Sequence, residues 1–164
     1  MPGREAALET QGRLIVDVAR LPKGGDVYKG ETGPDLLGLG DSEFVTPVGG
    51  IEYALKVDIL GTELLVRGEV RQRLQCVCSR CADTFESEAV DPDFISSTEI
   101  NETTDFIDLT EEIREAIILA LPGYPVCQET CRGLCMACGA NLNTGKCTCR
   151  KTGKDTRWSA LDAL

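Results

Sequence analysis

Cysteine is the residue that most constrains what this chain can fold into. Nine cysteines stand in 164 residues, and six of them lie between residues 127 and 149. The sequence has no histidine, which excludes Ser-His-Asp and Cys-His catalytic groups and zinc sites built on imidazole. The N-terminal dozen residues hold no apolar run, and the longest apolar stretch, residues 116–121, is far shorter than the roughly 20 residues that span a bilayer. We therefore expect a cytoplasmic protein whose reduced thiols bind metal or do redox chemistry.

Two Cys-x2-Cys pairs give the clearest metal signal. Cys78 and Cys81 follow an expected strand, and Cys135 and Cys138 are followed by Gly139. This spacing lets two thiolates face one ion, and a small residue after the pair lets backbone N–H groups point at the sulfurs. Because a tetrahedral zinc ion needs four ligands, eight cysteines complete two sites and leave one over.

Sequence order predicts how the eight ligands divide between two zinc ions. One site is compact enough to close by itself, and we call it the local site: Cys135, Cys138, Cys147 and Cys149. The other cysteines form what we call the long-range site, which would pin the end of a strand hairpin to a distant segment: Cys78, Cys81, Cys127 and Cys131. Cys76 lies on the apolar side of its strand, and we interpret it as a small buried hydrophobe.

The same cysteines leave room for other chemistry. Cys131, Cys135 and Cys138 have the spacing of the radical-SAM iron–sulfur motif, which we reject because too few residues follow Cys138 to build that large fold. A ferredoxin-type cluster and a dithiol redox centre at Cys78 and Cys81 stay open as alternatives.

Alternation with a period of two predicts a hairpin of long strands. Apolar side chains alternate with polar ones over residues 51–59 and again over residues 64–76, with Gly61 and Thr62 as the turn. We expect a first strand over residues 14–18, and a further strand over residues 84–95 that is interrupted at Pro92. Six glycines and a proline in residues 23–40 predict a long loop.

One helix is expected before the cysteine-rich segment. Asp108 and Glu111 form the pattern of an N-cap with a carboxylate three residues on, apolar residues then recur at helical spacing, and Pro122 ends the pattern. The fold class is therefore α+β: a mainly antiparallel β body with one central helix and a cysteine-rich zinc-binding C-terminal extension. We divide the chain into a flexible tail (1–12), a β-rich body with a helix near 109–121 (13–125), a zinc-binding segment (126–150) and a C-terminal linker with a short helix (151–164).

Charge is uneven along the chain. The formal net charge is −10, which repels nucleic acid on average. Eleven acidic residues and no lysine or arginine stand between residues 81 and 113, as a solvated face or as a docking surface for a basic partner. Two basic groups flank the metal sites, and they are our candidates for nucleic-acid binding: Arg67, Arg71, Arg73, Arg80, Lys146, Arg150, Lys151, Lys154 and Arg157.

The order of motifs points to a known family. The motifs are CSRC at 78–81, LALP at 119–122, PVC at 125–127, CRGLC at 131–135, CGANLN at 138–143, CTC at 147–149 and DTRW at 155–158. In this combined order the chain, over roughly residues 12–164, resembles the YceD family, the large ribosomal RNA subunit accumulation proteins. Each Cys-x2-Cys pair alone would be a weak signal.

The resemblance implies a role and partners. It implies a non-enzymatic factor that supports large-subunit ribosomal RNA accumulation and ribosome biogenesis, bound to that RNA or its precursors, or to a large-subunit ribosomal protein. No catalytic residue is established for that family, so none is carried over, and the family's recurrent ligands map onto the long-range site. We also expect no membrane partner and no small-molecule substrate. The alternatives are a zinc-stapled protein-interaction adaptor without direct RNA contact and, less favoured, an iron–sulfur or thiol redox protein.

Overall fold

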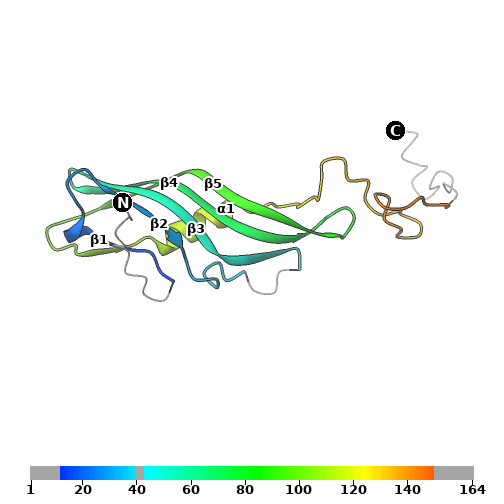
Figure 1. Cartoon of the computed structure of the whole chain (residues 1–164), viewed down its shortest axis with the longest axis horizontal. Helices are drawn as coiled ribbons and strands as arrows, with labels where there is room; N and C mark the ends of the chain where they lie inside the picture. The colour runs from blue at the N-terminus through cyan, green and yellow to red at the C-terminus, as the bar shows by residue number, and fades with distance from the viewer. Residues whose placement is uncertain (1–11, 40–42, 150–164) are drawn as a thin grey trace, which may run out of the picture.

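The structure is a computed structural model that describes residues 12–39 and 43–149. Its main element is a four-stranded antiparallel sheet in the order β2-β3-β4-β5 (Figure 1). The strands are β2 (Asp26–Glu31), β3 (Val45–Leu60), β4 (Glu63–Val77) and β5 (Thr84–Glu99). A small second sheet pairs β1 (Ile15–Asp17) with β6 (Phe106–Asp108), and the helices are η1 (Val18–Arg20), a 3-10 turn, and α1 (Thr110–Ala120). The mainly antiparallel α+β prediction is confirmed.

The predicted hairpin forms the middle of the sheet. β3 and β4 pair from Val45 with Cys76 to Leu60 with Glu63, across a two-residue turn in which Gly61 has a φ of 65°. A left-handed φ at the first turn position suits glycine and matches the twist of the two strands. The alternation sorts the side chains as predicted, because Leu64 and Val66 are fully buried while Arg67 is exposed.

β5 runs further than its sequence pattern predicts. The expected interruption at Pro92 is wrong, since the strand continues through it to Glu99. Gly68 pairs with Phe94 and Val70 with Asp91, so the extra residues of β5 opposite Glu69 form a bulge that contains Pro92. A bulge on an edge strand tolerates proline because that residue need not donate to the ladder.

β2 corrects the prediction of a continuous loop over residues 23–40. It pairs antiparallel with β3, from Asp26 with Val57 to Glu31 with Glu52. Only Tyr28 among its side chains is buried, so the strand carries almost no apolar alternation. Its backbone hydrogen bonds to β3, which the side-chain pattern does not reveal, hold it in place.

The helix covers one face of the sheet. α1 packs on β4 and β5 (Figure 1). Its side chains Ile113 and Ile117 are completely buried in the main core. The helix begins one residue later than the predicted cap implies, because Leu109 is the N-cap. Asp108 still accepts the Thr110 N–H at 3.0 Å, so its carboxylate satisfies one donor of the first turn. No helix in the described part of the chain is long and apolar enough to cross a membrane.

Two buried side chains on β4 serve the core. Cys76 is 0% exposed and packs in the main apolar cluster, as predicted. Gln72 is 1% exposed, and the sequence analysis did not single it out. Its amide donates to the carbonyls of Val48 and Gly49, where β3 has its own register shift. Gln72 thus satisfies backbone acceptors that the bulge removes from the ladder.

The α1 packing predicts a contrast between two neighbouring apolar residues. Truncating Ile117, which is fully buried, to alanine should lower the free energy of unfolding by about 2–5 kcal/mol, because it opens a cavity. The matched control Leu119→Ala, at a side chain that is 79% exposed, should change it by less than about 0.5 kcal/mol. Urea unfolding measures both, and equal losses would contradict this packing.

Candidate metal centres

The turn between β4 and β5 meets the segment that follows α1. Inside the turn, Cys78 donates its N–H to the Asp83 carbonyl and Ala82 donates to the Cys78 carbonyl. The distant segment docks on it, because the Ser79 N–H donates to the Pro125 carbonyl at 2.8 Å. In Figure 1 the yellow-to-orange segment extends beyond this end of the sheet.

The long-range site is where these two segments bring four thiols together. All four sulfurs lie within 4.8 Å of one another, with 3.8 Å between Cys78 and Cys131 and 3.7 Å between Cys81 and Cys127. Cys78, Cys81 and Cys131 are buried, whereas Cys127 is partly exposed. All four cysteines are free thiols, as these separations require.

The local site closes within a short stretch of chain. Its four sulfurs also lie within 4.8 Å of one another, with 3.7 Å between Cys138 and Cys147 and 3.2 Å between Cys147 and Cys135. Cys138 and Cys149 are exposed, so this site lies closer to solvent than the long-range site. The eight thiols thus form the two groups that the sequence analysis expects, and each group could hold a metal ion.

The geometry fits one tetrahedral ion in each site. Zinc–sulfur bonds of about 2.3 Å at tetrahedral angles place the sulfurs roughly 3.8 Å apart, close to most of the separations above. A four-iron cluster binds each thiolate to a different iron and needs a wider cage. Four thiolates around one ion also leave no open coordination position. The donor set therefore suits zinc or a single iron ion.

Both Cys-x2-Cys turns have the same backbone geometry. Arg80 N–H donates to Sγ of Cys78, and Ala137 N–H donates to Sγ of Cys135, each at 3.4 Å. The residue after each pair has a left-handed backbone, with φ of 58° at Ala82 and 72° at Gly139. Small residues at this position let the amides turn toward the sulfurs, which is what a bound thiolate requires.

One thiol in each site is unusually acidic. Burial acts to raise the pKa of Cys78, but N–H donors that include those of Cys127 and Arg80 outweigh it and lower the pKa to about 6. In the local site, the Ala137 and Cys138 N–H donors lower the pKa of Cys135 to about 6. Each site therefore already presents a thiolate near neutral pH.

Another thiol in each site resists ionisation. The Asp83 N–H favours the thiolate of Cys81, but burial and the neighbouring thiols prevail and raise its pKa to about 12. Hydrogen bonds with Cys138 and Cys147 raise the pKa of Cys149 to about 12. An incoming cation would displace the protons that the clustered thiols share.

The strand arginines already have carboxylate partners. On the outer face of the sheet Arg67 pairs with Asp58, at 3.4 Å. Arg71 pairs with Glu69 and Glu88, and Arg73 pairs with Glu52. Arg80 instead donates to the carbonyls of Glu129 and Cys131, so its guanidinium supports the long-range site. For the exposed Lys146 no ion pair occurs among the described residues, and the structure does not describe Arg150, Lys151, Lys154 and Arg157.

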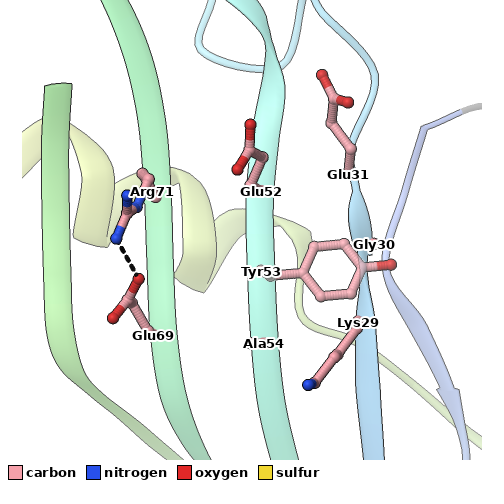
Figure 2. A pocket seen from close by; sticks show the side chains of 8 residues that line it. All are labelled: Lys29, Gly30, Glu31, Glu52, Tyr53, Ala54, Glu69 and Arg71. Carbon is pink, nitrogen blue, oxygen red and sulfur yellow. Dashed lines mark hydrogen bonds and ion pairs between the residues drawn. The ribbon is translucent and has the colours of Figure 1, made fainter. Parts of the chain in front are cut away.

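A shallow hollow on the sheet lies beside these ion pairs. Figure 2 shows Arg71 turned toward Glu69, with Glu52 nearby and Lys29 and Glu31 on β2. Three carboxylates and two cations line the hollow, and some of them already have partners: Arg71 pairs with Glu69, and Glu31 accepts the Gly50 N–H at 2.7 Å.

The sequence analysis missed side chains that support the sulfurs. Asn143 donates its amide Nδ2 to Sγ of Cys131 at 3.2 Å, and Asn141 donates to the Asp83 carboxylate at 2.6 Å. Both residues stand in the CGANLN motif, but their place in the turn between the local-site ligands by itself indicates only loop residues.

Comparison with known proteins gives one family. Residues 86–164 match the family model described as "Large ribosomal RNA subunit accumulation protein YceD". This stretch contains the local site and two ligands of the long-range site. The resemblance inferred from the motifs is thereby confirmed. No solved structure gives a significant match.

Individual relatives match over parts of their length. Two are named "Large ribosomal RNA subunit accumulation protein YCED homolog 1, chloroplastic": one from Arabidopsis thaliana is 38% identical over 35% of this chain, and one from Zea mays is 49% identical over 27%. These matches cover 18% and 15% of the two plant proteins, well under two thirds of their length. An uncharacterized protein of Mycobacterium leprae is 28% identical over 85% of this chain and 74% of its own.

The two thiol groups predict metal content by variant. Cys78→Ser should reduce bound zinc from two ions to one ion per chain, because three ligands cannot close a structural site. Cys138→Ser should do the same at the local site. Cys76→Ser is the matched control and should retain both ions, since Cys76 lies in the apolar core outside both groups. Elemental analysis of the purified proteins measures this, and loss of an ion from Cys76→Ser would contradict the assignment.

The acidic thiols predict how zinc affinity depends on pH. Protons compete with zinc for the thiolates, so the apparent affinity should fall as the pH is lowered. The fall should steepen below about pH 6, where Cys78 and Cys135 also become protonated and each ion must displace more protons. Competition against a chelating dye, calibrated at each pH, measures the slope. A slope that stays constant on both sides of pH 6 would contradict these pKa values.

Proposed function

We propose that this chain, which belongs to the YceD family over residues 86–164, is a non-enzymatic factor for the accumulation of large-subunit ribosomal RNA. The observation that carries the proposal is the extent of the family match. It covers α1, which packs against the sheet, and the thiol-rich segment that follows the helix. We propose two structural zinc ions as its cofactors. Its partner would be large-subunit ribosomal RNA or a precursor.

A structural role for the metal follows from what the sites join. The apolar cluster around the long-range site is small. Besides its four cysteines, the described part of the chain adds only Phe85 and Val126, both partly buried. So small an apolar cluster cannot hold a segment by hydrophobic burial alone. A structural zinc site contributes on the order of 10 kcal/mol to folding. The metal would therefore take the place of a core between the β4–β5 turn and the segment after α1.

Direct RNA contact is assigned mainly to the C-terminal cations. Lys146 is exposed and lies beside the local site, and the sequence continues it with a basic stretch: Arg150, Lys151, Lys154 and Arg157. Arg67, Arg71 and Arg73 would have to exchange carboxylates for phosphates, which lowers their net gain from RNA. We retain them as secondary contacts.

The acidic stretch favours a second candidate function, a zinc-stapled adaptor for a basic ribosomal protein. Eleven carboxylates fall between residues 81 and 113, and the ion pairs of the described residues engage only three of them: Glu88, Asp108 and Glu111. The unpaired carboxylates give the surface a negative field that steers cationic partners. In this alternative the adaptor affects ribosomal RNA through the bound protein.

The proposed compartment is the cytoplasm. Thiolate-bound zinc of this kind needs a reducing environment, because oxidation to disulfides would empty the sites. The names of the two plant relatives place those proteins in the chloroplast.

Sedimentation of a fresh native-host lysate tests the function. On a sucrose gradient at low salt, the protein should migrate with large-subunit precursors and be depleted from mature ribosomes. Raising the salt should release it if phosphates provide the contact, since counterions then compete with its cations. A protein that stays wholly in the light fractions at low salt would contradict stable attachment to the precursor.

Two matched charge variants separate RNA contact from adaptor function. Neutralising Arg150, Lys151 and Lys154 should weaken co-migration and flatten its salt dependence if RNA is bound directly. Reversing Glu99, Glu102 and Asp105 should leave co-migration unchanged in that case. The opposite pattern would favour the adaptor.

A further inference from the structure

We infer that the two metal sites are coupled and that Asn143 is the positioning residue that links them. Asn143 stands between Cys138 and Cys147 in the chain, yet its Nδ2 donates to Sγ of Cys131 at 3.2 Å. A loop that the local site closes therefore supplies a hydrogen bond to a ligand of the long-range site. This inference rests on the metal binding proposed above and adds a dependence between the two ions.

Three further hydrogen bonds hold Asn143 in place, through its side-chain amide, its backbone and the neighbouring Leu142. Its Oδ1 accepts the Arg132 N–H at 2.8 Å, and its own N–H donates to Oδ1 of Asn141 at 2.9 Å. Next to it, the Leu142 N–H donates to the Gly133 carbonyl at 2.9 Å. The orientation of Nδ2 toward the sulfur is thus fixed from both sides, by the residue that follows Cys131 and by the loop itself.

The same loop also touches the β4–β5 turn. Nδ2 of Asn141 donates to the Asp83 carboxylate at 2.6 Å, and the Leu134 N–H donates to the Arg80 carbonyl at 3.1 Å. Leu134 and Asn141 also form a bridge to each other. The local-site loop is therefore a small hairpin seated against the segments that carry the long-range ligands.

Order in this hairpin depends on the local ion. With four thiolates gathered at its end, the hairpin presents a fixed N–H donor to the Cys131 thiolate. When the local site is empty, ordering this loop costs conformational entropy before the Asn143 amide can donate to the sulfur. Outer-shell donors of this kind change metal affinity by roughly 10–100-fold. Filling the local site should therefore tighten the long-range site and, by linkage, the reverse should hold equally.

The test measures zinc affinity of the long-range site in full-length protein. Four proteins form a double-mutant cycle: wild type, Asn143→Ala, Cys135→Ser with Cys138→Ser, and all three changes together. A competing chelator gives the affinities, and cadmium-113 NMR identifies which site each ion occupies. Asn143→Ala and the double serine variant should each weaken the long-range site about tenfold. The combination should be little worse than the double serine variant.

Two single variants isolate the proposed contact. Asn143→Asp keeps an acceptor for the Arg132 N–H but lacks the donor to the sulfur, so it should weaken the long-range site at least as much as Asn143→Ala. Thr144→Ala is the matched control in the same loop, because among the described residues its hydroxyl bonds only to the Asn141 carbonyl, at 3.5 Å. It should leave both affinities unchanged.

Several results would overturn the inference. Unchanged long-range affinity in the double serine variant would show that the sites are independent. Equal losses from Asn143→Ala with and without the local site would show that Asn143 does not carry the coupling, and wild-type affinity in Asn143→Asp would exclude its donor. If the serine variant does not fold, native mass spectrometry of the wild-type protein at limiting zinc tests the coupling instead. Coupled sites should give less of the species with one bound ion than two independent sites would. Two ions bound independently would refute only this inference, whereas no bound metal would refute the proposed zinc sites.

Discussion

The convergence of four thiols from two distant segments is the constraint on which the rest of this structure depends. Cys78 and Cys81 come from the β4–β5 turn, and Cys127 and Cys131 come from the chain after α1. Several hydrogen bonds join these segments, including the one from the Ser79 N–H to the Pro125 carbonyl, but the apolar cluster described around the thiols is small. A cation shared by the thiolates is therefore the strongest interaction available to hold this end of the molecule together.

The β4–β5 turn, which carries the first two ligands, lies at the end of two long paired strands. β4 and β5 are paired along almost their whole length, so the Cys-x2-Cys turn lies at a position that the sheet defines. α1 packs on the same two strands and then delivers the second pair of ligands through Pro122 and Pro125. Sheet and helix thus position the eight thiols that could hold metal, and the sequence after them carries the cations that we propose as the RNA contact.

Features set by local pattern could be predicted from the sequence, and features set by backbone or tertiary contacts could not. The hairpin follows from period-two alternation, and the grouping of the thiols follows from spacing and the need for four ligands. β2 was missed because an edge strand with one buried side chain has no apolar period. β5 continues beyond Pro92 because this residue lies in a bulge opposite Glu69, where it need not donate a hydrogen bond to β4. The donor role of Asn143 depends on a contact between sites, which no local pattern encodes.

X-ray absorption at the zinc edge of the purified protein measures directly whether four thiolates bind each ion. We expect each zinc to be surrounded by four sulfur atoms at about 2.3 Å, with no oxygen or nitrogen ligand and no second metal nearby. Lighter ligands in the first coordination sphere, metal–metal scattering, or a protein that folds fully without any metal would contradict it.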